Sequence, residues 1–115
     1  MNPQAPYILQ GDGEIRAVLD VLILKNEKVF VAYCPGLNLS TYGDNEDDVQ
    51  SAFEDAVEIF FKDTHTMGSL DRVLTKLGWK AHQIPVSRFE LKKKQQTQPD
   101  VIRSVRHEYH VQYAH

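Results

Sequence analysis

Two histidines near the end of the chain, His107 and His110, are the residues whose types most directly suggest metal chemistry. Zinc metalloproteases hold their metal with two histidines four residues apart on a helix, in the pattern HExxH. Here the histidines are only three apart, and residues 101–113 are rich in Val, Ile and Tyr, which favours a strand. On a strand, residues three apart point to opposite faces. We therefore expect a solvated strand and no metal site.

Two acids, Asp20 and Asp44, could in principle help to hold the pair of metal ions that some phosphate-cleaving enzymes use. Asp20 lies inside an apolar run, and Asp44 lies at a turn. The neighbouring acids at 46–48 are explained by a helix start, so no further carboxylate is placed beside these two. We expect a structural role for Asp20, and we expect no catalytic residues, no cofactor and no metal.

The remaining reactive or charged groups also favour structural interpretations. Cys34 is the only cysteine, so no internal disulfide can form, and its place after the apolar run 29–33 predicts a buried thiol. Lys92, Lys93 and Lys94 could touch a phosphate backbone, but no aromatic residues are interleaved with them. We expect these three lysines to be solvated.

The distribution of charge is more informative than the net charge of −3. The 115 residues fit one domain, with 4 Lys or Arg against 12 Asp or Glu in residues 1–65 and 9 against 4 in residues 66–115. The acidic half favours a basic partner, and the basic half could meet nucleic acid or the acidic half of another copy. The chain has neither a signal-peptide pattern nor an apolar run long enough to span a membrane, which predicts a cytoplasmic protein.

A long amphipathic helix is predicted from residue 45 to about residue 62. Its apolar positions share one stripe and are Val49, Ala52, Phe53, Ala56, Val57 and Phe60. Asp44 or Asn45 is suited to the N-cap, and the acids at 46–48 favour the positive end of the helix dipole. Gly43 is expected to take the positive φ of a strand-to-helix corner.

Three strands precede this helix, at residues 15–24, 29–33 and 37–42, and the first two are expected to form a hairpin. The first strand has long apolar character, so we expect both of its faces to be largely covered. A short second helix is predicted to begin after Ser69 and to stop at Gly78, with Trp79 sealing one end of the core.

One or two C-terminal strands follow, at 86–91 and 101–113, on either side of a polar linker at 92–100. The predicted fold class is therefore α+β: a small, mainly antiparallel sheet with one long helix across it and a second short helix. We divide the chain into a domain at 1–80 and a strand-rich extension at 81–115 that is packed on, or swapped with, the same domain.

The segment from about residue 29 to residue 80 resembles the HicB-like antitoxins of bacterial toxin–antitoxin systems. The segments that carry the resemblance are Val31–Pro35, Leu37–Leu39, Gly43–Asp47, the helix residues Ala52, Ala56 and Phe60, and Leu77–Lys80. The resemblance implies a partial RNase H-like fold and a non-catalytic protein that binds a small basic, RNA-cleaving, HicA-like toxin. Family members usually add a two-helix DNA-binding unit, and residues 81–115 contain no such pattern, so DNA binding is not expected.

We expect the acidic face of the long helix to bind the partner. The candidate residues are Glu46, Asp47, Asp48, Glu54, Asp55 and Glu58. An exposed strand edge could add main-chain pairing. The alternative function is that of a structural or regulatory homo-oligomer without a toxin, assembled through its C-terminal strands as a dimer or a tetramer.

Overall fold

A computed structural model describes residues 6–11, 13–82, 87–91 and 101–113. These residues form seven strands and two helices, in the order β1 (Tyr7–Gly11), β2 (Glu14–Asn26), β3 (Val29–Cys34), β4 (Leu39–Gly43), α1 (Glu46–Thr66), α2 (Leu70–Lys76), β5 (Trp79–His82), β6 (Ser87–Leu91) and β7 (Val101–Gln112). The predicted α+β class, with one long and one short helix on a mainly antiparallel sheet, is confirmed. The lysine tract at 92–94 and the linker at 92–100 lie outside the described residues.

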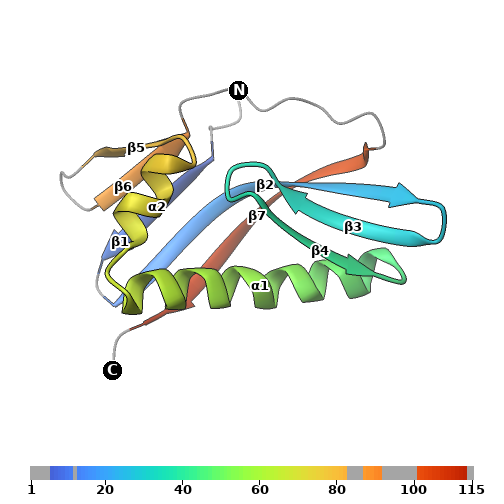
Figure 1. Cartoon of the computed structure of the whole chain (residues 1–115), viewed down its shortest axis with the longest axis horizontal. Coiled ribbons are helices and arrows are strands. Elements are labelled where there is room, and N and C mark those ends of the chain that lie inside the picture. The colour runs from blue at the N-terminus through green and yellow to red at the C-terminus, as the bar shows by residue number, and fades with distance from the viewer. Residues whose placement is uncertain (1–5, 12, 83–86, 92–100, 114–115) are drawn as a thin grey trace.

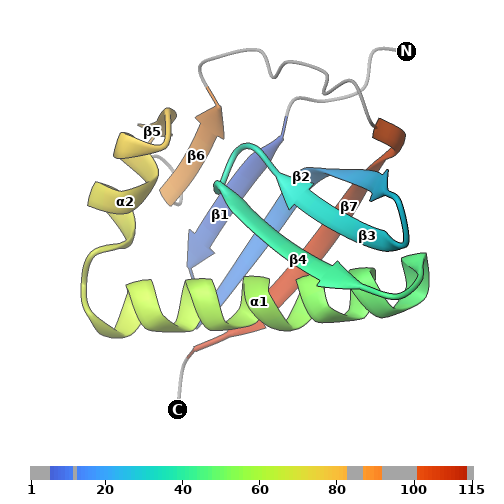
Figure 2. The same cartoon turned by 45° about the vertical axis from the view of Figure 1, so that its right-hand side comes forward.

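The long strand β2 is the centre of the sheet. It pairs β7 along residues 14–24, β1 along 14–18 and β3 along 22–26, always antiparallel. Because β7 occupies one edge of β2 over nearly its whole length, β1 and β3 share the other edge. The path continues from β1 to β6 and β5, and from β3 to β4. Figure 2 shows β7 beside β2 on the side away from β1.

The two faces of β2 differ in burial. Its odd-numbered side chains form the core face and are fully or almost fully buried: Ile15, Ala17, Leu19, Val21 and Ile23. On the opposite face only Leu22 is buried, while Arg16 is exposed and Val18, Asp20 and Leu24 are half-buried. The expectation that both faces are largely covered is therefore wrong for the second face, because both helices contribute to the core on the first face alone.

Helix α1 closes the core face of the sheet, as Figures 1 and 2 show. The buried positions of the helix recur at helical spacing and are Val49, Phe53, Val57, Phe61 and Thr64. Asn45 is the N-cap, and its side-chain oxygen accepts a hydrogen bond of 2.9 Å from the backbone N–H of Asp48. The predicted helix start is thus confirmed, while the helix extends one turn beyond its predicted end near residue 62.

Gly43 serves this corner in a different way from the one predicted. The glycines with positive φ are Gly13, Gly68 and Gly78, and Gly43 is not among them. A Cβ at Gly43 would instead lie 2.9 Å from the backbone nitrogen of Val49. Glycine is needed here because the end of β4 approaches the first turn of α1 too closely to leave room for a side chain.

The second helix and Trp79 close the other end of the core. Ser69 precedes α2 as predicted, although its side chain makes no capping hydrogen bond. Trp79 is 1% exposed, and its indole N–H donates a 2.7 Å hydrogen bond to the carbonyl oxygen of Gly36. Its structural role is confirmed. Residues 79–82 also form strand β5 on β6, which was not predicted from the sequence. No helix among the described residues is long and apolar enough to cross a membrane.

Candidate partner-binding surface

The six predicted partner-binding acids all lie on the first 13 residues of α1. Their spacing at 100° per residue places Asp47, Glu54 and Glu58 on the side that faces β7, and Asp48 and Asp55 on the side that points away from the sheet. All five of these side chains are exposed, whereas Glu46 is half-buried. The structure therefore presents most of the predicted acidic surface to solvent.

Three of the six acids already have partners within the chain. The Glu46 carboxylate forms a 2.7 Å ion pair with the Arg103 guanidinium of β7, which connects the start of α1 to the start of that strand. Glu58 pairs with Lys62 one turn later, at 2.7 Å. The Asp48 carboxylate accepts a 3.2 Å hydrogen bond from the Asn45 side chain. Asp47, Glu54 and Asp55 are thus the acids best placed to meet a partner's cations.

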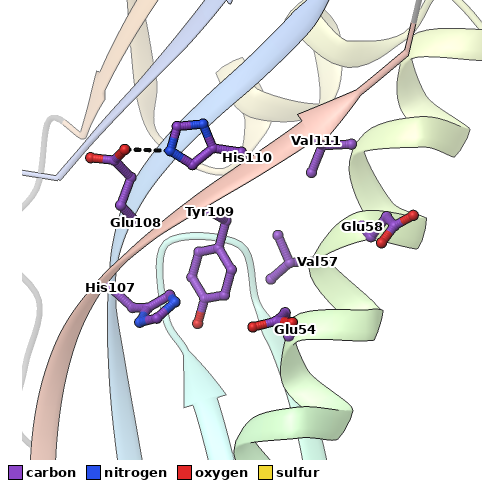
Figure 3. Close-up of a pocket in the computed structure, with 8 residues that line it drawn as sticks. All are labelled: Glu54, Val57, Glu58, His107, Glu108, Tyr109, His110 and Val111. Carbon is purple, nitrogen blue, oxygen red and sulfur yellow. Dashed lines mark hydrogen bonds and ion pairs between the residues drawn. The ribbon is translucent and has the colours of Figure 1, made fainter.

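An open groove of about 250 Å³ runs between α1 and β7. Its lining combines acids, histidines and apolar side chains, which are Glu54, Val57, Glu58, His107, Glu108, Tyr109, His110 and Val111. Figure 3 shows Tyr109 between the strand and the helix, with His107 and Glu54 beside it. The groove therefore lies between the acidic side of α1 and residues 107–111 of β7.

Tyr109 forms the floor of this groove. Its ring packs on Phe53 at a centroid distance of 6.0 Å and on His107 at 4.6 Å. Burial raises the pKa of the Tyr109 phenol well above its ordinary value, and the electrostatic influence of the nearby Cys34 and Glu54 side chains acts in the same direction. The phenol therefore stays neutral and acts as a packing group with a polar end.

The acids considered for metal binding do not come together. The Asp20 carboxylate lies on the face of the sheet away from α1, where both of its oxygens accept hydrogen bonds from the Arg106 guanidinium at 2.7 and 2.9 Å. Asp44 is exposed at the corner before α1. Within the described part of the chain, no group of three or more His, Cys, Asp or Glu side chains could hold a metal ion.

The histidines and the cysteine lie as the sequence predicted. His107 and His110 are exposed on β7, where they belong to opposite faces of the strand. His110 contacts the Glu108 carboxylate, which lies two residues away on the same face. Cys34 is fully buried, and burial raises the pKa of its thiol to about 11. A thiol with this pKa is protonated and unreactive at neutral pH.

The β7 side of the groove was missed by sequence reasoning. A helix reveals its exposed acids through its period, but the pairing of β7 with β2 joins residues about 90 positions apart in the sequence. One local signal exists: Val105, Tyr109 and Val111 all fall on odd positions, which indicates one covered face of a strand. That pattern identifies the buried side of β7 and does not identify its neighbour.

The surface thus consists of an exposed acidic side of α1, next to an open groove and strand β7. Comparison of the chain with protein-family models, with curated proteins and with solved structures gave no match.

Proposed function

We propose that the chain is a non-catalytic, antitoxin-like binding module that sequesters a small basic toxin of the RNA-cleaving, HicA-like kind. The observation that carries the proposal is the acidic side of α1 beside the groove, where Asp47, Glu54 and Asp55 are exposed. Opposite charge on a partner would steer its approach and fix its orientation.

The fold also supports this proposal, because strands β2, β3 and β4 lead through a tight corner into a long helix in the order that the resemblance implies. Local physics explains most of the residues that carry the resemblance: Gly43 by close approach, Asn45 by capping and Trp79 by burial. These residues support the architecture. Glu54 and Asp55 have no such structural task, so they are the acids that a binding experiment should change.

The test is co-expression with the product of the neighbouring reading frame, followed by affinity purification of this chain. A small basic protein should co-purify, and its retention should weaken as salt is added, because exposed charges are screened. The variant Glu54→Lys with Asp55→Lys should lose the partner. The matched control is Asp63→Lys with Asp71→Lys, which changes the net charge equally at exposed sites on the same helix and on α2.

Two results would contradict the proposal. One is that the neighbouring product does not bind at all. The other is equal loss of binding in the two double variants, which would show a response to net charge and not to this surface of α1.

A homo-oligomer assembled through the C-terminal strands is the second candidate, and the outer edge of β7 favours it. Among the described residues β7 pairs only β2, so one of its two edges carries no strand partner. An unpaired edge is a ready template for another strand.

A further inference from the structure

The outer edge of β7 is the longest unpaired strand edge that the structure describes. The other terminal strands of the sheet, β4 and β5, have 5 and 4 residues, whereas β7 has 12. Short edge strands are one way in which proteins avoid pairing with other chains. The described part of β7 lacks this protection, and it also contains no proline.

The direction of the main-chain groups along this edge follows from one hydrogen bond. The backbone N–H of Tyr113 donates to the carbonyl oxygen of Gly13 at 2.9 Å, in register with the pairing of Gln112 with Glu14. In an antiparallel ladder, hydrogen-bonded and non-hydrogen-bonded residue pairs alternate. The odd residues of β7 therefore point their N–H and C=O groups at β2. The even residues, from Ser104 to Gln112, point theirs outward.

Two-fold pairing of β7 with its own copy is restricted by this alternation. Even-numbered residues must pair with even-numbered residues of the copy, because only these point their main-chain groups outward. The sum of two paired residue numbers is therefore even. The two-fold axis must then lie midway between one residue and the same residue of the copy. An axis at Arg106 or at Glu108 would place like charges directly opposite each other, which is destabilising. An axis at His107 avoids that conflict, and it lies as close to the middle of β7 as an axis at Arg106, so the overlap is no shorter.

The register centred on His107 also pairs opposite charges. It places Arg106 opposite Glu108 of the second copy, and does so twice because of the symmetry. On the other face, which lies toward α1, Val105 meets Tyr109, a β-branched and aromatic pair of the kind that stabilises sheets. Each Arg106 already pairs with Asp20 of its own chain, so the new contacts extend an existing row of charges across the joined sheets.

We infer that two copies of this chain associate through their β7 strands, antiparallel and centred on His107, to form one continuous sheet. The paired stretch runs from residue 103 to residue 111 in each copy and contains about eight new main-chain hydrogen bonds. The assembly does not depend on toxin binding, and the outward-facing acids of α1, Asp48 and Asp55, point away from the joined sheet.

The first measurement is the mass of the wild-type chain by light scattering and by sedimentation. We expect twice the chain mass of 13.2 kDa. Glu108→Arg would place two arginines opposite each other and should raise the dimer dissociation constant about tenfold or more. Adding Arg106→Glu restores opposite charges and should recover most of the affinity. Asp71→Arg, on α2, is the matched charge control and should have no effect.

The second measurement tests the position of the axis. Residues that face themselves in a non-hydrogen-bonded antiparallel pair have Cα atoms about 4.5 Å apart, within the range that a disulfide spans. His107→Cys should therefore form a covalent dimer under mild oxidation. His110 is also exposed on the same strand but faces Ser104 of the copy, so His110→Cys should cross-link far less. The native Cys34 is buried and should not contribute.

Several outcomes would overturn the inference. A monomeric mass, with no cross-linking of the His107→Cys variant, would show that the edge does not pair with a second copy. A dimer that is unaffected by Glu108→Arg would place its interface elsewhere. Equal cross-linking of the His107→Cys and His110→Cys variants would exclude an axis at His107. Cross-linking specific to His107→Cys, together with rescue by the charge swap, would establish it.

Discussion

The two faces of the β2–β7 pair are built on opposite principles. Toward α1, β2 presents a row of buried apolar side chains such as Leu19, and β7 adds the buried side chains of Tyr109 and Val111. On the other face, the same two strands carry ion pairs that are open to solvent, such as Asp20 with Arg106 and Arg16 with Glu108. One face therefore supplies the hydrophobic free energy of folding, and the other arranges charges in a fixed register along the strand.

The two faces should therefore differ in how much each side chain contributes to the stability of the fold. Burial of an apolar side chain contributes a few kcal/mol, whereas an exposed ion pair contributes about 1 kcal/mol or less. The charged face can therefore be varied with little cost to the fold, which suits a surface that sets strand register or contacts a partner. Substitutions on the covered face should be far more damaging than substitutions on the open face.

The largest effect is expected for Phe53→Ala, on the core side of α1. Phe53 is 1% exposed and packs on Tyr109, so its truncation should lower the free energy of unfolding by about 3–5 kcal/mol. Denaturant unfolding followed by circular dichroism measures this loss. Ile59→Ala is the matched control, because Ile59 is 60% exposed on the same helix and its truncation should change stability by about 0.5 kcal/mol or less.

The core face also contains the one thiol, and this gives a pH-dependent effect. Burial raises the pKa of Cys34 from 9.0 to about 11 in the folded chain, so the folded state holds its proton more tightly than the unfolded state does. The resulting stability is fully present below about pH 9 and is lost as the pH rises towards 11. At pH 11 the loss should be about 2 kcal/mol, because each unit of pKa difference is worth about 1.4 kcal/mol.

Comparison with Cys34→Ala isolates this contribution, because tyrosines and lysines titrate in both proteins. The free energy of unfolding of the wild type should fall relative to that of Cys34→Ala between pH 9 and pH 11. A difference between the two proteins that stays constant over this range would show that the thiol is not shielded from solvent.

A third effect concerns the corner that places α1 on the covered face. Gly43→Ala would put a Cβ 2.9 Å from the Val49 nitrogen, so β4 and α1 must move apart, at a cost of about 1–3 kcal/mol. Gly68→Ala separates crowding from backbone strain: Gly68 has a φ of +66° and no atom within 4 Å of a Cβ. It should cost about 1 kcal/mol through strain alone.

Thermal and denaturant midpoints of these two glycine variants test the geometry of the corner directly. If Gly43→Ala were as stable as the wild type, the close approach of β4 to the helix would be wrong. Such a result would also remove the explanation of why residue 43 is a glycine.

The covered face was largely predictable from the sequence, because its signals are local. The stripe from Val49 to Phe60, the cap at Asn45 and the hairpin between β2 and β3 are set by residues close together in the chain. Strand β5 was missed because only four residues at Trp79–His82 form it, too few for alternation to be read. Residues 79–82 form a strand because they pair antiparallel with β6.

The open face and the edge of β7 could not be predicted in the same way. Asp20 was recognised as an unusual acid in an apolar strand, but its partner Arg106 lies 86 residues later. The acids of α1 were correctly expected on the helix surface, whereas their neighbours His107 and Glu108 depend on the same long-range pairing. Sequence periodicity indicates which face of an element is covered, and tertiary pairing decides what lies beside the uncovered face.

The smallest expected effect is that of the Asp20–Arg106 pair, and it measures how open the second face is. The Arg106 guanidinium holds Asp20 with two hydrogen bonds, and hydrogen bonding to Asp20 is the main cause that raises the pKa of Arg106. The Asp20 side chain is 22% exposed and the Arg106 side chain is 34% exposed, so solvent screens the pair.

A double-mutant cycle with Asp20→Asn and Arg106→Gln should give a coupling free energy of about 0.2–1 kcal/mol. This coupling should shrink in about 1 M salt, where the screening length falls to about 3 Å. A coupling of several kcal/mol that does not respond to salt would mean that the pair is shielded from solvent, and the contrast between the two faces would then have to be abandoned.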